Sequence, residues 1–368
     1  MKKNNVLIYP YNYNVTPFIR YREILSDFDI VGADTLPGLL LSGRDAAFAD
    51  EGKPTGITVT TSFHESCEKA DTLIWAECSS ALRKSGFKTI IKNILYALDC
   101  GKEIMCLDDI DPSVIAFLKS YAEETPGEFI HYKDLCYQSC DTGFTGIELK
   151  VPVIMVGSIH EGNSKFEMQM MLYKNLQEEG LKILYIGSKP YSEVFGFHSI
   201  PDFMFQAERT EGEKIRGFKN YIRHLIDQEN PDVILIGIPG GILPCHDKVD
   251  YNFGMLYYEI LQVVIPDFMI MMLPGDNYQD NALRNLTESV KGRLPIPVDV
   301  FGISNFRFDY ETVEFSYATI NYDILGMDKM KKIKERYCRI LPEENICVST
   351  IESEQQLCLK WLIDKLGV

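Results

Sequence analysis

Residues 151–187 constrain the fold of this chain more than any other stretch. An apolar run at 151–156 ends in Gly157, a polar loop follows, and an amphipathic segment at 165–179 leads to a second apolar run at 182–186. This order of strand, loop, helix and strand predicts a parallel sheet. In such a unit the loop presents backbone amides and a helix N-terminus to an anion, so we expect a phosphate-bearing ligand.

The loop of this unit departs from the regular phosphate loop, GxxxxGK[ST]. Gly157 and Gly162 have the regular separation, but two residues stand between the second glycine and Lys165. In the regular loop, backbone N–H groups and the lysine hold phosphate, while a hydroxyl holds magnesium. We expect the phosphate contacts from Gly157, Ser158, Gly162, Asn163, Ser164 and Lys165.

Two missing groups, a hydroxyl and a carboxylate, argue against metal-dependent phosphoryl transfer, and one acidic residue in the loop disfavours phosphate itself. Glu161 lies inside the loop, where a carboxylate repels phosphate unless a cation intervenes, and Glu167 follows where the hydroxyl is expected. The apolar run at 231–237 also lacks a carboxylate at its end, because Asp232 stands at its start. Three interpretations follow: a loop that binds nucleotide, a degenerate loop that has lost its ligand, and an ordinary strand-to-helix turn.

Further candidate residues follow other predicted strands. Runs at 182–186, 231–237 and 268–273 each end in a polar or glycine-containing turn, and a loop at 41–52 combines glycines with charges. In open α/β sheets the carboxyl ends of the strands collect binding residues. The residues that we expect at such a ligand edge are Lys189, Gly240, Gly241, Asp276, Asn277, Arg44 and Asp45.

The alternation of strand and helix patterns predicts an α/β protein of two domains. Residues 1–145 are predicted to form a Rossmann- or flavodoxin-like doubly wound domain. Residues 146–368 are predicted to form a P-loop-NTPase-like parallel-sheet domain with C-terminal helices. A chain of 368 residues has room for two such cores.

Composition limits the partners and the compartment. The formal charge of −16 argues against nucleic acid and anionic membranes. The ten cysteines include no CxxC pair, so we expect no metal cluster and no metal site. The opening residues lack the apolar core of a signal peptide, and no apolar run approaches the roughly 18 residues of a membrane span. We therefore expect a cytoplasmic protein.

Seven short motifs carry a family resemblance. They are YPY at 9–11, PFIR at 17–20, GRDAAFAD at 43–50, KFEMQ at 165–169, KPYSEVFG at 189–196, PDVILIG at 231–237 and IPDF at 265–268. In this order they resemble a largely clostridial family of peptide-maturation-system proteins, encoded with cysteine-rich natural-product precursors and radical-SAM enzymes. The second domain is also similar to a P-loop family that includes D-glutamate N-acetyltransferase. There the loop ends in Gly-Lys with a Thr after one residue, whereas here Ser164 precedes Lys165 and Glu167 follows.

The resemblance implies a protein of natural-product peptide maturation that binds ATP or GTP through its degenerate loop. The alternatives are an N-acyltransferase that holds the phosphates of coenzyme A, which would need no metal, and a non-catalytic scaffold. The implied partners are a precursor peptide and a radical-SAM maturase, and self-association into a homo-oligomer stays open.

Overall fold

The computed structural model describes residues 3–137, 150–160, 164–244, 254–314 and 319–367. Within these residues the chain divides into two compact units. Unit 1 comprises Met1–Cys136 and Glu193–Gly196, and unit 2 comprises Tyr137–Ser192 and Phe197–Val368. The predicted boundary at 145/146 lies outside the described residues. The return of Glu193–Gly196 to unit 1 was not predicted; there, the Phe195 ring stacks on Phe18 with centroids 3.8 Å apart.

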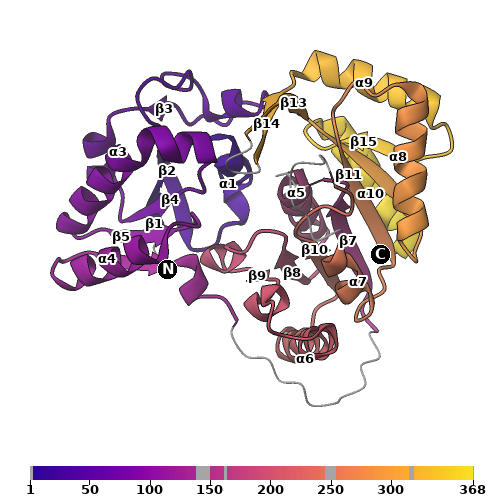
Figure 1. The fold of residues 1–368 in the computed structure, drawn as a ribbon, viewed down its shortest axis with the longest axis horizontal. Helices are drawn as coiled ribbons and strands as arrows, with labels where there is room; N and C mark the ends of the chain where they lie inside the picture. The colour runs from indigo at the N-terminus through magenta and orange to yellow at the C-terminus, as the bar shows by residue number, and fades with distance from the viewer. Residues whose placement is uncertain (1–2, 138–149, 161–163, 245–253, 315–318, 368) are drawn as a thin grey trace. The chain divides into compact units, whose positions relative to one another are not determined.

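Unit 1 is built on a six-stranded parallel sheet in the order β3-β2-β1-β4-β5-β6 (Figure 1). Its strands are β1 (Asn4–Tyr9), β2 (Phe28–Asp34), β3 (Val59–Thr60), β4 (Thr72–Trp75), β5 (Glu103–Cys106) and β6 (Glu128–His131). Its α-helices are α1 (Thr16–Arg20), α2 (Phe63–Lys69), α3 (Ser80–Asp99) and α4 (Pro112–Glu123). This is the strand order of doubly wound dinucleotide-binding folds, with the order reversing between β1 and β4.

One core of unit 1 lies between the sheet and helices α2, α3 and α4. Leu7 and Trp75 from the strands pack there with Ile94 of α3 and Leu118 of α4. Asp111 caps α4, because its carboxylate accepts a hydrogen bond of 2.8 Å from the Ser113 amide.

Unit 2 is built on a seven-stranded parallel sheet in the order β15-β12-β11-β7-β10-β8-β9. Its strands are β7 (Val153–Ser158), β8 (Ile183–Gly187), β9 (His198–Ser199), β10 (Val233–Gly237), β11 (Phe268–Pro274), β12 (Val300–Ser304) and β15 (Ile346–Val348). The chain leaves β7 for β8 on one side of the sheet, and later leaves β11 for β12 on the other. The strand order therefore reverses between β7 and β11, where α/β sheets bind ligands.

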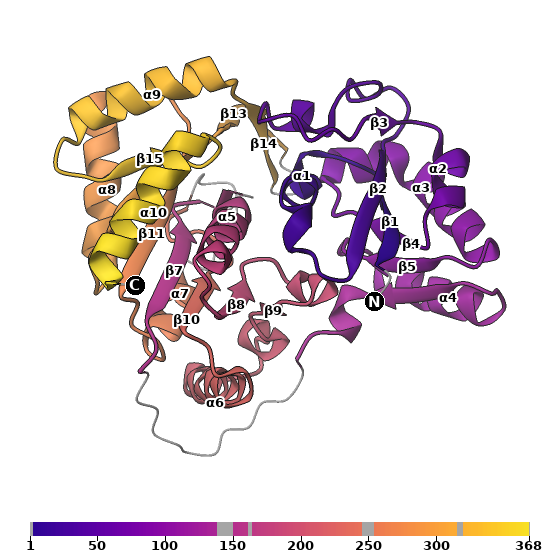
Figure 2. The same ribbon diagram turned by 180° about the vertical axis from the view of Figure 1, so that it is seen from behind.

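Helices cover both faces of the second sheet. Helices α5 (Ser164–Glu178) and α10 (Glu352–Leu366) lie on one face, as Figure 2 shows from behind. The other face carries α6 (Glu211–Glu229), α7 (Met255–Leu261), α8 (Asp280–Arg293) and α9 (Met327–Ile340). All core strands are buried along their length, which explains their continuous apolar runs. The predicted two-domain α/β fold with two parallel sheets is thus confirmed.

A two-stranded antiparallel hairpin follows β12 and was not predicted. It consists of β13 (Phe306–Glu314) and β14 (Thr319–Ile324), and its first strand begins at the carboxyl edge of the sheet. The hairpin therefore begins at the same edge of the sheet as the loops that follow β7, β10 and β11.

Candidate functional site

Three loops converge at the carboxyl edge of the second sheet. They follow β7, β10 and β11, which are neighbours in the order β11-β7-β10. The loop after β7 bonds to strand β11 and to the loop after β10: the Ile159 amide donates to the Met272 carbonyl of β11 over 2.9 Å, and the Leu243 amide donates to the Ile159 carbonyl over 3.0 Å. Lys165 enters the same space from the first turn of α5.

The Lys165 ammonium is buried at the centre of this edge, and its side chain is among the largest fully buried ones. Nζ donates to the Gly240 carbonyl at 2.5 Å and to the Ser158 hydroxyl at 3.0 Å. An ammonium withdrawn from water is costly unless polar atoms surround it. Ser158 at the end of β7 and Gly240 in the turn after β10 supply such atoms. They hold the positive charge where the helix N-terminus already favours an anion.

Tyr257 of α7 occupies the space behind Ser158. Its hydroxyl accepts from the Ser158 amide at 2.8 Å and donates toward the carbonyls of Ser158 and Gly240, at 3.1 and 3.4 Å. A Cβ at Gly157 would lie 2.8 Å from the Tyr257 ring, so only glycine fits there. The missing side chain of Gly157 therefore makes room for the Tyr257 ring. A phosphate could bind the Ser158 amide only if Tyr257 moved.

Gly241 is required by the contact between two loops. A Cβ there would lie 2.6 Å from the His160 Cα and 2.7 Å from the Ile159 carbonyl oxygen, both backbone atoms. The preceding Gly240 has a φ of 79°, which favours glycine. These two glycines bring the turn after β10 against the loop after β7, and this approach places the Gly240 carbonyl beside Lys165.

His160 is a buried residue of the site that sequence reasoning missed. Its Nδ1 lies 3.3 Å from the Leu243 carbonyl, and its ring meets the Phe308 ring of the hairpin edge-on at 5.5 Å. Burial lowers the pKa of His160 to about 4, against a smaller opposite effect of the hydrogen bond to Leu243. The imidazole is therefore neutral near pH 7, with its proton on Nδ1 and a lone pair on Nε2.

The loop after β11 carries Asp276 and Asn277, as predicted for this edge. Helix α9 holds both: the Tyr337 hydroxyl donates to the Asp276 carbonyl at 2.7 Å, and Arg336 donates to the Asn277 side chain. The Asp276 carboxylate accepts from the Asn277 amide at 2.6 Å. The bond from Arg336 occupies one lone pair of the Asn277 oxygen and ties this loop to α9.

Lys189 follows β8, two strand positions from β7, which corresponds to about 10 Å at the sheet. Its ammonium lies 5.7 Å from the centre of the Tyr191 ring. The structure therefore places the Lys189 ammonium beside a ring of its own turn.

Arg44 and Asp45 belong to unit 1 and have structural contacts there. The Arg44 guanidinium lies 3.8 Å from the centre of the Phe48 ring. The Asp45 carboxylate accepts from the amides of Ala47, Thr55 and Gly56 and from the Thr55 hydroxyl, over 2.7 to 2.9 Å. Partial burial acts to raise the pKa of Asp45, but these donors outweigh it and lower the pKa. The carboxylate thus fixes its own loop.

Part of the predicted phosphate loop lies outside the described residues. This applies to Glu161, Gly162 and Asn163, and to the side chain of Ser164, the first residue of α5. Within the described residues no three His, Cys, Asp or Glu side chains gather as a metal-binding group. In the same part of the chain, no helix combines the length and apolar character needed to cross a membrane.

Sequence reasoning also missed the role of Tyr257. It is one of two tyrosines in α7, and its side chain is fully buried. Its hydroxyl acts on a residue 99 positions away, so no local signal could have found it.

Comparison with known proteins supports the fold. No family model matches the sequence, and no curated protein matches it. Among solved structures, the chain is similar to a DUF1611 family protein from Anabaena variabilis, with a TM-score of 0.62, 11% identity, and coverage of 98% of this chain and 100% of that one. At that identity the likeness shows the two-domain fold alone.

Weaker likenesses are to chloroplast FtsY from Physcomitrella patens and to hydrogenase maturation factor HypB from Archaeoglobus fulgidus. The first has a TM-score of 0.35 and 13% identity, covering 76% of this chain and 90% of that one. The second has a TM-score of 0.31 and 15% identity, covering 58% and 89%. Both are too distant to carry an argument about this chain.

Proposed function

We propose that the chain binds a nucleotide, ATP or GTP, through its phosphates at the start of α5. The observation that carries this proposal is the buried Lys165 ammonium, held by the Gly240 carbonyl and the Ser158 hydroxyl at the carboxyl edge of the sheet. A phosphate is a stronger acceptor for an ammonium than a neutral carbonyl is, because both partners are charged.

Phosphate binding at this edge requires an exchange of bonds. The ammonium would turn from Gly240 toward the phosphate, and the N-terminus of α5 would add its dipole. The Ser158 amide stays with Tyr257, so the chain supplies fewer backbone donors from the strand end than a regular phosphate loop does. We therefore propose that the nucleotide is bound and hydrolysed slowly or not at all. Its role is then to stabilise one conformation of the protein.

One observation favours coenzyme A as a second candidate ligand. Strand β10 ends at Gly237, and the buried Ile238 follows it, so no carboxylate at this point helps to place magnesium. Transfer of an acyl group from its coenzyme A thioester requires binding of the coenzyme A phosphates but no metal.

The resemblance to peptide-maturation-system proteins supports a further step, which rests on the nucleotide proposal. We place this chain with a precursor peptide and a radical-SAM maturase as partners. Co-purification of the tagged chain with a co-expressed precursor, with and without ATP, tests that step. Recovery of precursor only with ATP supports it, and equal absence in both samples contradicts it.

Thermal unfolding in the presence of ATP, GTP or coenzyme A tests the ligand class. A ligand at about 100 times its dissociation constant adds about 2.7 kcal/mol to the free energy of unfolding. For domains of this size that amounts to several degrees in Tm. A rise with ATP or GTP supports the proposal, a rise with coenzyme A alone favours acyl transfer, and no rise with any of them contradicts both.

A further inference from the structure

Unit 1 contains a hollow of about 510 Å³ at the carboxyl edge of its own sheet. Its walls come from the segments that follow β1, β2 and β4, the strands on either side of the point where the strand order reverses. Open α/β sheets bind ligands at this point, and the volume falls within the range of small-molecule sites. All the residues that line the hollow belong to unit 1, whereas the proposed phosphate site lies in unit 2.

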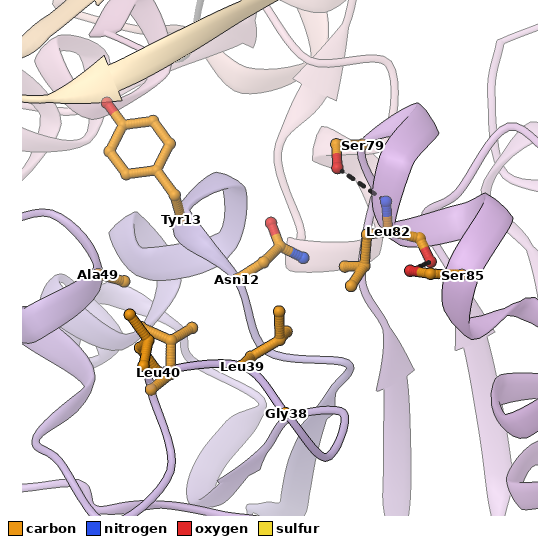
Figure 3. Close-up of a pocket in the computed structure, with 10 residues that line it drawn as sticks. Asn12, Tyr13, Gly38, Leu39, Leu40, Ala49, Ser79, Leu82 and Ser85 are labelled. Atoms are coloured by element: carbon orange, nitrogen blue, oxygen red, sulfur yellow. Dashed lines mark hydrogen bonds between the residues drawn. The ribbon is translucent and has the colours of Figure 1, made fainter.

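Two opposite walls of the hollow are apolar. Leu39, from the segment after β2, and Leu82, from α3, turn toward the same space, with Leu40 and Ala49 beside Leu39 (Figure 3). Leu40 is 80% exposed, which is unusual for a leucine and leaves apolar surface in water. Facing apolar walls suit a flat ring, whose two faces they cover.

The polar groups of the hollow are held in place. The side-chain NH2 group of Asn12 donates to the carbonyls of Pro10 and Glu77, both at 3.0 Å. It thereby ties the segment after β1 to the segment after β4. The Ser79 hydroxyl accepts from the Leu82 amide at 3.2 Å as the cap of α3, and its own proton can be donated to a ligand. The Asn12 Oδ1 accepts from the Asn14 amide at 2.9 Å, which leaves a second lone pair on that oxygen for a donor on the ligand. This lone pair and the Ser79 proton can read the edge of a ring without first becoming ordered.

The same hollow lacks the means to hold a phosphate. A dinucleotide-binding fold has glycines after β1, which let the backbone approach a pyrophosphate. Here Tyr9, Pro10 and Tyr11 take those places, and the Tyr11 hydroxyl is buried against the Ala46 carbonyl at 2.8 Å. None of the ten residues that line the hollow carries a charge. The ligand that fits is neutral.

We infer that unit 1 binds an unphosphorylated purine nucleoside in this hollow, with the base between Leu39 and Leu82. Its ring edge and ribose hydroxyls reach Asn12 and Ser79. This site is separate from the phosphate site at Lys165 and does not depend on it.

Calorimetric titration of the full chain with adenosine, and separately with AMP, tests the inference. Leu40→Asp places a carboxylate on the wall and should weaken adenosine binding at least tenfold. Leu135→Asp is the matched control, since Leu135 is 43% exposed in unit 1 and does not line the hollow, and it should leave the affinity unchanged. AMP should bind at least tenfold more weakly than adenosine, because no cation lines the hollow.

Three results would overturn the inference: no binding of adenosine to the wild-type chain, equal loss in both variants, or AMP binding as tightly as adenosine. Titration of Leu40→Asp with ATP separates the two sites. Retained ATP binding together with lost adenosine binding supports independent sites, whereas loss of both ligands would place ATP at the hollow as well and contradict independent sites.

Discussion

The Nζ of Lys165 lies 2.5 Å from the carbonyl oxygen of Gly240, which joins the first turn of α5 to the turn after β10. These residues stand 75 positions apart in the chain. The contact exists because Gly240 and Gly241 allow two loops to meet at the sheet edge. The proposed nucleotide site depends on this meeting of loops more than on any single motif.

Replacing Gly241 with alanine should disrupt that meeting. The new Cβ would collide with the backbone of Ile159 and His160 at 2.6 to 2.7 Å, and backbone atoms cannot swing aside as a side chain can. Overpacking typically costs about 1–3 kcal/mol, and we expect the upper end of that range in urea unfolding. Gly292→Ala is the control: nothing lies within 4 Å of its Cβ, so alanine in α8 should stabilise the chain by about 0.5–1 kcal/mol. Equal stability of the two variants would contradict the assignment.

Removing the Tyr257 hydroxyl should destabilise the loop without abolishing ligand binding. Tyr257→Phe leaves the buried Ser158 amide without its acceptor, at a cost of about 1–3 kcal/mol in the free energy of unfolding. The freed amide then becomes available to phosphate, so ATP affinity should hold or increase. Tyr258→Phe, in the next position of α7 and only half-buried, should change stability by less than about 0.5 kcal/mol. Loss of ATP binding in Tyr257→Phe alone would show that the hydroxyl itself belongs to the site.

Acid should destabilise the chain partly through His160. Its pKa is about 4 in the folded chain against an ordinary 6.5, so between these pH values the unfolded chain binds a proton that the folded chain does not. The free energy of unfolding therefore falls as pH drops from 6.5 to 4, by roughly 3 kcal/mol from this group. His160→Phe should flatten the pH dependence over this window, while His224→Gln on the exposed face of α6 should leave it unchanged. Parallel curves for wild type and His160→Phe would refute this.

Local sequence patterns predicted most of the architecture. The apolar run of β7 and the amphipathic segment of α5 could be recognised in the sequence, because burial imposes a pattern of apolar residues along the chain. The hairpin β13–β14 was not predicted. Its two strands pair with each other and not with the core sheet, so they lack the continuous apolar runs of the core strands.

The site was less predictable than the fold. Lys165 could be named from its spacing to Gly157, and Gly240 from its place after a predicted strand. Their contact could not be predicted, because it follows from the strand order β7-β10. His160 and Tyr257 had no motif at all, since their roles are set by burial and by loops brought together in space. Arg44 and Asp45 looked like ligand residues because charged loops often bind, yet Asp45 serves its own turn.

Calorimetric titration of ATP into wild-type chain and Lys165→Met tests the central claim most directly. Methionine keeps the buried stem of Lys165 but removes the ammonium, so folding should persist. We predict that ATP binds the wild type and binds Lys165→Met about 10- to 100-fold more weakly, as expected for one charge-assisted contact of about 1.5–3 kcal/mol. Lys182→Met, at the exposed opposite end of β8, should bind like wild type. Equal ATP affinity in wild type and Lys165→Met, with both folded, would contradict the account.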